Sequence, residues 1–562
     1  MKSNLMIRWT ILLSFLGQTF AIEKKPNVLI ILADDVGTED VVGYWGNNIV
    51  DMPNLQKLQD KGVTFMDAHS SPKCAPSRYM LLSGNYHHRG TKVYGSWGFE
   101  DKQSQFRKRQ RSIAHMLQSI GYKTGMLGKW HIGAGVPGEY NGRNMLSCCN
   151  LNWTKPVTGG PNDLGFDESF FSMQGLREPY AFFEDGYLTT KEEDIVFYEK
   201  GSTWETANQN GLSMVDKNCD GDRNWDSSQY DMDLVIKAED FIERHTASED
   251  PFFLYLALGM VHEPHSPPIK YHDGTPIAGT YATSHLDKLW EMDKIIGSIV
   301  TKLEETNEIQ NTIIIFTSDN GGLRMGYRNK FLRSAKGSLY EGGHRVPFVM
   351  RYDGVIPAGE KRDSHYISLA DVYATLSEMI GFNIPSQSAQ DSFSFASYAK
   401  SERNTSGLRR YLPEWDFINI PKKGHILSGD SIRMGDFKYI RKLRDKNGNL
   451  LQKPRESLYN LKGDIQEKSN LLRNVFINKR YEEMKKKMKT QLRRLGQCPY
   501  DKDNTMNFEL RGGLREGETV NCDWFRTKRR KRCNFQIVGE LYCNSLCGRF
   551  RDQCSAYDRT EL

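Results

Sequence analysis

The chain has 562 residues, 38% of them hydrophobic and 26% charged, and its formal net charge is +6. This length exceeds one ordinary domain, and the composition is that of a globular protein with ample material for a core. The net charge is small for a chain of this size, so it allows a mild preference for anionic partners but does not indicate nucleic acid.

The N-terminus has the pattern of a secretory signal peptide over residues 1–21. Lys2 and Arg8 supply positive charge before the short apolar run 9–20, and Ala21 is a small residue at the cleavage site. An uncleaved anchor is the alternative, but the run is short for a membrane span. Because no other stretch approaches that length, we expect no transmembrane segment and a lumenal or secreted protein.

The ten cysteines agree with an oxidising compartment, and Asn152 and Asn404 are glycosylation acceptors suited to a secreted surface. Six of the ten lie from Cys498 onward, which predicts a small disulfide-stapled extension.

The first predicted strand, residues 27–33, is a continuous apolar run that ends in Asp34 and Asp35. Runs of this kind are typical of strands buried on both faces of a parallel sheet. The carboxyl end of such a strand faces the ligand crevice in open α/β sheets, and two carboxylates there need a cationic partner. A surface turn is the alternative interpretation of the Asp-Asp-x-Gly segment.

A helix over 54–62 and a strand over 63–68 lead into the segment 74–84, Cys-Ala-Pro-Ser-Arg-Tyr-Met-Leu-Leu-Ser-Gly. Arg78 is expected on the first turn of a helix. The alternative for Cys74 is a buried or disulfide-bonded cysteine beside a Pro-Ser turn.

A helix over 113–121 and a strand over 122–127 precede Lys129 and His131, which glycines flank on both sides. At a strand end, this arrangement can bring a cation and a proton-transfer group close to a ligand. Residues 147–230 are rich in Gly, Asp, Asn and aromatic residues and predict long loops with short elements, which we expect to build the substrate pocket.

The pattern of helices and buried strands continues along the chain: helices over 232–246, 286–306 and 365–381, and strands over 251–258, 312–317 and 346–351. His262 and His265 follow one of these strands, and Pro264 makes a regular helix at that point unfavourable. Asp319 and Asn320 follow another, which repeats the oxygen-rich end of the first strand, and Lys336 comes shortly after them. The alternation predicts an α/β sandwich around a mostly parallel sheet.

Beyond a polar boundary at 397–407 we expect short strands such as 431–442, a hairpin turn at 446–448 and a basic helix over 481–495. The run 528–532 holds five adjacent cations. It is open to three interpretations: a solvated loop, a furin-type processing site, or a remote docking patch for a polyanion. The last four residues, Arg-Thr-Glu-Leu, are a loose variant of an endoplasmic-reticulum retrieval signal, with an arbitrary tail as the alternative.

Together and in this order, the fragments resemble the type I sulfatases, whose signature is Cys-x-Pro-Ser-Arg, a hydrophobic turn, and Ser or Thr before Gly. The resemblance covers about residues 26–459 and is strongest to the arylsulfatase branch. Ser83 stands where many relatives carry Thr, and the tail after Cys498 matches nothing in the family. The matching positions are Asp34, Asp35, Cys74, Arg78, Lys129, His131, His262, Asp319, Asn320 and Lys336.

The resemblance implies a fold and a division of the chain. The fold is an alkaline-phosphatase-like α/β sandwich around a large, mostly parallel sheet, with a smaller C-terminal α+β domain and a Cys-rich tail. We expect a signal peptide over 1–21, a catalytic domain over 22–400, a C-terminal subdomain over 401–497 and a Cys-rich basic tail over 498–562.

The resemblance also implies a mechanism. Cys74 is oxidised in the endoplasmic reticulum to Cα-formylglycine by a formylglycine-generating enzyme. One hydroxyl of the aldehyde hydrate attacks sulfur, and the other expels sulfate from the covalent hemiester. Arg78 and Lys336 hold the hydrate, and His131 takes the proton from its second hydroxyl.

The remaining positions have implied roles in binding. Lys129 and His262 grip sulfate oxygens, and His262 or Lys336 protonates the leaving alcohol. A divalent cation, with calcium first and magnesium as the alternative, is bound beside position 74 by four oxygen ligands: Asp34, Asp35, Asp319 and Asn320.

Three function classes remain open from the sequence. The first is a sulfatase that acts on a sulfated small molecule or saccharide. The second is a phosphodiesterase or phosphonate hydrolase on the same scaffold, and the third is an inactive binder of sulfated ligands. Lysosomal, secreted and endoplasmic-reticulum locations are all compatible with the secretory route.

Overall fold

The computed structural model describes residues 24–45, 49–92, 97, 103–135, 154–199, 203–205, 212–214, 219–324, 331–403, 405, 407–420, 424–473, 479–495, 507–509 and 519–521. The predicted signal peptide, the acceptors Asn152 and Asn404, the basic run 528–532 and the last four residues lie outside this part of the chain. Cys74 is a buried free thiol, and Cys219 is disulfide-bonded.

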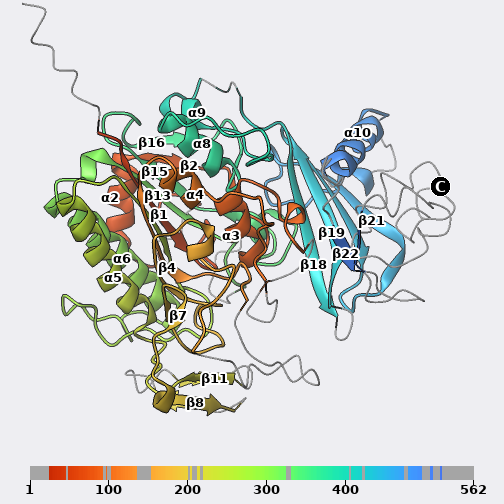
Figure 1. Ribbon diagram of the computed structural model, residues 1–562. Coiled ribbons are helices and arrows are strands. Elements are labelled where there is room, and N and C mark those ends of the chain that lie inside the picture. Colours follow the sequence, from red (N-terminus) through yellow and green to blue (C-terminus); the bar gives the residue numbers. More distant parts are fainter. Residues whose placement is uncertain are drawn as a thin grey trace, which may run out of the picture.

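Five parallel strands form the centre of a ten-stranded sheet (Figure 1). In spatial order they are β13 (Thr312–Ser318), β1 (Asn27–Ala33), β12 (Phe252–Ala257), β4 (Lys123–Lys129) and β5 (Glu168–Ser172). Every residue of β1, β12 and β13 is buried, as their apolar runs predict.

Shorter strands, mostly antiparallel, complete both edges of this sheet. Beyond β13 lie β15 (Phe348–Arg351), β2 (Val63–Phe65) and β16 (Glu360–Arg362), and beyond β5 lie β6 (Phe183–Glu184) and β7 (Tyr187–Leu188). A separate three-stranded sheet joins β14 (Arg345–Val346), β3 (Ala68–His69) and β17 (Ile367–Ser368). The predicted helix over 365–381 was therefore wrong at its start, because residues 367–368 pair with β3.

Helices cover both faces of the large sheet, which gives the sandwich (Figure 1). One layer contains α2 (Pro53–Lys61), α5 (Tyr230–Ala247) and α6 (Ser284–Glu305). The other contains α3 (Cys74–Ser83), α4 (Ile113–Gln118), α8 (Asp371–Met379) and α9 (Ala396–Lys400). The single turn α7 (Glu341–His344) lies between β13 and β14 in the chain.

A four-stranded antiparallel sheet follows the sandwich, with the order β18 (Leu412–Ile420), β19 (Gly424–Met434), β20 (Phe437–Arg444) and β21 (Leu450–Asn460). The helix α10 (Lys479–Leu495) contributes the buried side chains of Met488 and Leu492. The strands have 8 to 11 residues, so the prediction of short strands here was wrong. Three small antiparallel strand pairs complete the described strands: β8 (Ile195–Tyr198) with β11 (Cys219–Asp222), β9 (Thr203–Glu205) with β10 (Leu212–Met214), and β22 (Asn507–Glu509) with β23 (Thr519–Asn521).

Buried charges connect the four-stranded sheet to the sandwich. Arg433 of β19 pairs with Asp67 at 2.8 Å, and Lys438 of β20 pairs with Glu341 at 2.8 Å. We call the whole group the interface cluster; its members are Asp67, His69, Glu341, His344, Arg345, Arg433 and Lys438, all buried. Because the two strands supply cations and the sandwich supplies carboxylates, ion pairing contributes to the attachment of the two parts.

Of the helices in the described part of the chain, none combines the length and apolar character required to cross a membrane.

Candidate active site

The carboxyl ends of β1 and β13 bring four oxygen-bearing side chains together: Asp34, Asp35, Asp319 and Asn320. The two strands are parallel neighbours with Ala33 opposite Ser318, so the residues that follow them leave the sheet at the same edge. All four side chains are buried. The backbone N–H of Asp35 lies 3.3 Å from Asp319 Oδ1, and Asn320 Nδ2 donates to Asp35 Oδ1 at 2.7 Å.

Cys74 is the first residue of α3 and lies at this same edge, only 4% exposed. The turn before it is braced by Ser77, whose Oγ accepts from the backbone N–H of Ser71 and donates to the carbonyl of Lys73, both at 2.9 Å. The Cys74 Sγ lies 3.4 Å from His131 Nδ1. The helix start therefore holds the cysteine within reach of an imidazole.

Arg78 lies one helical turn beyond Cys74 and links α3 to two of the strand ends. Its Nε donates to Asp319 Oδ2 at 2.8 Å, and its Nη1 donates to the carbonyl of Lys129 at 2.8 Å. The side chain is fully buried. This guanidinium is a fixed positive charge beside the cysteine.

Lys129 ends β4, and its ammonium donates to Asp34 Oδ2. Gly128 before it has φ +104°, and a Cβ there would meet the carbonyl oxygen of Ala257 at 2.0 Å. Only glycine allows β4 to approach β12 so closely while the chain turns toward the site.

Lys336 and His262 approach Asp35 from two loops. Lys336 Nζ lies 2.6 Å from Asp35 Oδ1, and His262 Nε2 lies 3.9 Å from Asp35 Oδ2. The other ring nitrogen of His262, Nδ1, donates to the carbonyl of Glu263 at 2.7 Å, so Nε2 faces the site without a proton in the neutral ring.

The three aspartates titrate differently because their neighbours differ. Burial alone would raise the pKa of Asp34, but the surrounding cations, first Lys129, hold it well below its usual range. Burial also opposes ionisation of Asp35, and Lys336 lowers its pKa overall. The pKa of Asp319 is raised by burial and then by the charge of Asp34, which outweigh Arg78. A further cation is what would keep all three carboxylates ionised together.

Burial and nearby cations keep both histidines neutral. Burial, then Lys129 and Arg78, depress the pKa of His131 well below its usual value. Burial, then Lys336, lower the pKa of His262 to about 3. Each imidazole can therefore accept a proton at neutral pH.

The oxygen-rich group fits a hard divalent cation. Asp34 Oδ1 and Asn320 Oδ1 are buried and have no hydrogen-bond partner among the residues that the structure describes. Ligand atoms of Asp34, Cys74 and Asp319 lie within 4.8 Å of one another. Buried oxygens that lack a partner are costly unless something else binds them, and carboxylate and amide oxygens suit Ca²⁺ or Mg²⁺.

The structure brings every sequence-predicted catalytic, binding and metal residue into this one cluster. His265 is not part of it; its Nε2 bonds the carbonyl of Val261 at 3.0 Å. Sequence reasoning missed Lys73, whose ammonium donates to the carbonyl of Phe417 and lies 3.6 Å from Asp416. A contact between residues so far apart in the chain leaves no local sequence signal; the position of Lys73 directly before Cys74 was the only available indication.

Comparisons with known proteins agree with this geometry. A family model described as Sulfatase matches residues 26–382, more than half of the chain, and one described as N-sulphoglucosamine sulphohydrolase, C-terminal, matches residues 334–497. An N-acetylgalactosamine-6-O-sulfatase of Bacteroides thetaiotaomicron is 29% identical over 66% of this chain and 75% of its own length. A sulfatase of Formosa agariphila is 26% identical over 80% of this chain and 85% of its own length.

A solved structure from Bacteroides thetaiotaomicron, described under that organism's metabolism of multiple glycosaminoglycans, superposes with a TM-score of 0.67. It is 25% identical, and the match covers 84% of this chain and 99% of the other. The chain therefore belongs to the sulfatase family of sulfuric ester hydrolases.

Proposed function

We propose that this sulfatase hydrolyses the sulfate ester of a saccharide through a Cα-formylglycine made from Cys74. The observation that carries the proposal is the position of Cys74 at the start of α3, 3.4 Å from a neutral His131 and beside the buried cation Arg78. A saccharide substrate is supported by the two relatives from Bacteroides thetaiotaomicron, one named for a 6-O-sulfated sugar and one described with glycosaminoglycans.

Asp34, Asp35, Asp319 and Asn320 would hold one divalent cation, with calcium preferred and magnesium as the alternative. When bound, the cation supplies fixed positive charge for the nonbridging oxygens of the reacting sulfate. Lys129 and Lys336 now pair with two of the carboxylates, so both ammoniums stand next to the position that sulfate oxygens would occupy.

In the proposed reaction, one hydroxyl of the formylglycine hydrate attacks sulfur, and the sulfur–oxygen bond to the alcohol breaks. Arg78 and Lys336 stabilise the hydrate and its developing charge, and Lys129 and His262 hold sulfate oxygens. The leaving alcohol takes a proton from Lys336, or from His262 in its protonated form, which the negative charge of a bound sulfate favours and in which Nε2 can also donate to a sulfate oxygen. His131 then removes the proton of the second hydroxyl, sulfate leaves, and water rehydrates the aldehyde.

We also propose that the protein follows the secretory route. Residues 1–21 direct the chain to the endoplasmic reticulum, where the formylglycine-generating enzyme converts Cys74 before folding. Asn152 and Asn404 are glycosylated there, and the product is secreted or delivered to lysosomes, with retention through the last four residues as the alternative.

The test compares sulfate release by the wild type with that of Cys74→Ala, on an aryl sulfate and on a sulfated disaccharide. We expect the variant to fold normally and to lose activity by about 10⁴-fold or more, because the nucleophile is gone. A phosphate diester and a phosphonate ester serve as counter-substrates. Turnover of these in place of the sulfates, or activity near wild type in Cys74→Ala, would contradict the proposal.

A further inference from the structure

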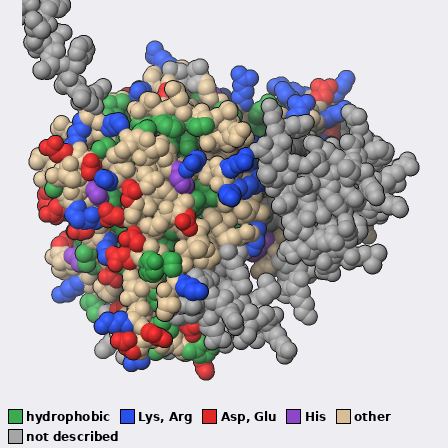
Figure 2. All heavy atoms as spheres, in the orientation of Figure 1, with side chains coloured by type: hydrophobic (Ala, Val, Ile, Leu, Met, Phe, Trp, Pro, Cys, Tyr) green, Lys and Arg blue, Asp and Glu red, His purple; other side chains and the backbone are tan. Residues whose placement is uncertain are grey.

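The helix α10 carries eight Lys and Arg residues but only two carboxylates, Glu482 and Glu483. Its buried face, with Met488 and Leu492, leaves charged side chains on both flanks. In the face of the molecule shown in Figure 2, Lys and Arg side chains gather in the region where Figure 1 draws α10. The two flanks differ in how these charges are paired.

One flank is neutralised by the neighbouring strand. Lys489 lies 3.0 Å from Glu456 of β21, and Lys485 lies 3.5 Å from the same carboxylate. Lys485 also pairs with Glu482 at 2.8 Å. These two lysines therefore stabilise the packing of the helix on the sheet and are poorly available to a ligand.

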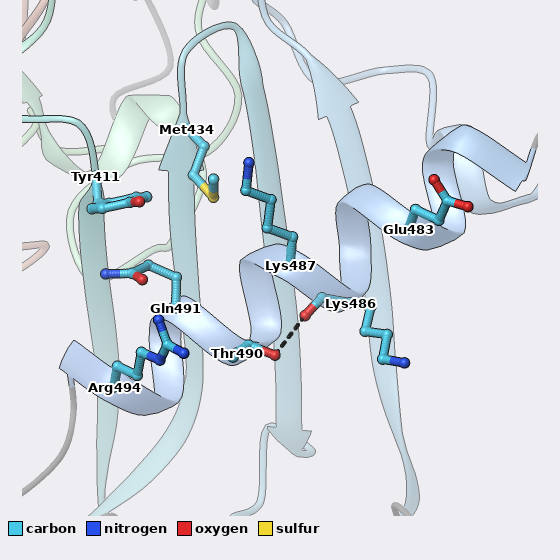
Figure 3. A pocket seen from close by; sticks show the side chains of 8 residues that line it. All are labelled: Tyr411, Met434, Glu483, Lys486, Lys487, Thr490, Gln491 and Arg494. Atoms are coloured by element: carbon cyan, nitrogen blue, oxygen red, sulfur yellow. Dashed lines mark hydrogen bonds between the residues drawn. The ribbon is translucent and has the colours of Figure 1, made fainter.

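The other flank lines a pocket of about 370 Å³ between α10 and the start of β18 (Figure 3). Lys486, Lys487 and Arg494 line it, and no carboxylate among the described residues forms an ion pair with any of the three. The side chain of Lys487 points toward Met434 and that of Arg494 lies beside Gln491, whereas the ammonium of Lys486 points away from Met434 and Tyr411 (Figure 3). The ring of Tyr411 and the amide of Gln491 lie on the same wall, and Glu483 lies toward one end of the helix (Figure 3). The pocket thus combines unpaired cations with an aromatic ring and an amide.

We propose that this pocket binds a sulfated or carboxylated segment of a saccharide chain, at a site separate from the active centre. Guanidinium and ammonium groups recognise sulfate and carboxylate oxygens, and a tyrosine ring with an amide beside it suits the apolar face and hydroxyls of a sugar. A membrane surface fits less well, because interfacial helices present an apolar face with aromatic residues to the lipid, and α10 buries its apolar face in the protein.

The pocket lies at a distance from Cys74 that a polymer can span. Asp416 of β18 pairs with Lys73, the neighbour of Cys74, and Tyr411 stands five residues earlier, about 17 Å along an extended strand. A chain bound in the pocket would raise the local concentration of its other sulfate esters near the active centre. The pocket should therefore promote hydrolysis of long anionic saccharides. Hydrolysis of small aryl sulfates should not depend on it, because only the large substrate can reach the pocket and the active centre together.

The test measures binding without turnover, in full-length Cys74→Ala protein, with chondroitin sulfate chains and their chemically desulfated counterpart as probes. Lys487→Gln with Arg494→Gln should weaken binding of the sulfated chain by about tenfold at low salt. In the same variant, the slope of the logarithm of the binding constant against the logarithm of the salt concentration should become shallower by about one. Lys485→Gln with Lys489→Gln removes the same charge from the same helix and should weaken binding by less than about twofold.

Equal losses in the two double variants would overturn the proposal, since they would show a general charge effect. No loss in either variant, or equal binding of the desulfated chain, would also overturn it. Vesicles that contain phosphatidylserine test the membrane alternative. Tight vesicle binding that is lost only in the Lys487 and Arg494 variant, with chondroitin sulfate binding unchanged, would replace the saccharide with a lipid surface. Because the readout is binding and not turnover, failure of this proposal is distinguishable from failure of the formylglycine mechanism.

Discussion

The active centre and the interface cluster are built from the same residue types but differ in how their charges are satisfied. In the interface cluster, Asp67 and Glu341 each face two cations, which outweigh burial and hold both pKa values well below the usual range. In the active centre, Asp34 Oδ1 and Asn320 Oδ1 have no hydrogen-bond partner in the described part of the chain, and burial raises the pKa of Asp319. Buried charge that is fully paired serves stability, whereas buried charge that is left incomplete marks a place where a ligand binds.

Among the changes that compare the active centre with the interface cluster, the largest effect is expected at Asp319. Asp319→Asn removes one negative charge from three carboxylates crowded at one buried edge, so divalent-metal content should fall and sulfate release should drop by about 10³-fold. The same change relieves repulsion with Asp34, so the metal-free variant should unfold at no lower denaturant concentration than metal-free wild type. Metal analysis, kinetics and denaturation in chelator check this prediction; normal metal content and rate would contradict it.

At Glu341 of the interface cluster we expect a loss of stability without a loss of bound metal. Glu341→Gln leaves Lys438 and Arg345 short of a buried carboxylate and should lower the free energy of unfolding by about 3–5 kcal/mol. Metal content per folded molecule should stay unchanged. Glu184→Gln is the matched control, because Glu184 and Lys237 form an exposed pair that contributes about 0–1 kcal/mol. A similar small loss in both variants would show that the interface cluster does not hold the two parts together.

A smaller effect concerns the pH dependence of stability. Burial, then Lys438, depress the pKa of His344 well below 6.5 in the folded protein, while the unfolded chain protonates it normally. As the pH falls below about 6.5, the unfolded chain binds a proton at His344 that the folded chain does not. The free energy of unfolding therefore falls by up to about 1.4 kcal/mol per pH unit. The groups that face this ring are His69, Glu341 and Lys438.

The measurement is denaturant unfolding of wild type and His344→Gln at pH 7 and 5.5. The wild type should lose more stability on acidification than the variant. Glu467 also pairs with Lys438, and burial raises its pKa to about 7, but this opposing contribution is common to both proteins. Parallel pH profiles would mean that His344 is protonated in the fold.

Sequence reasoning succeeded where the signal is local. The apolar runs of β1 and β13 with acidic ends, and the short segment at Cys74, predict the edge of the sheet where the site lies. It failed where partners are distant: Asp67 and Arg433 are 366 residues apart, so neither position predicts the other. In the C-terminal sheet the hairpin turn at 446–448 was confirmed between β20 and β21, but the strand boundaries were wrong. Segments such as β21 are polar along most of their length, and only their last part is buried.

The helix over 365–381 illustrates a second limit. Its first residues have a helical pattern, but pairing of residues 367–368 with β3 delays the helix to Asp371. Tertiary pairing overrides local propensity there. In the candidate site, the residues themselves were predicted through resemblance to a family, whereas Lys73 and its contact with β18 emerge only from the fold.

The most direct test of the central claim is the mass of the peptide that contains residue 74, measured in the same preparation as sulfate release. If Cys74 is converted to formylglycine, the aldehyde form should be present, and specific activity across preparations should rise in proportion to the converted fraction. Full turnover in protein whose peptide carries only the unmodified thiol would contradict the account.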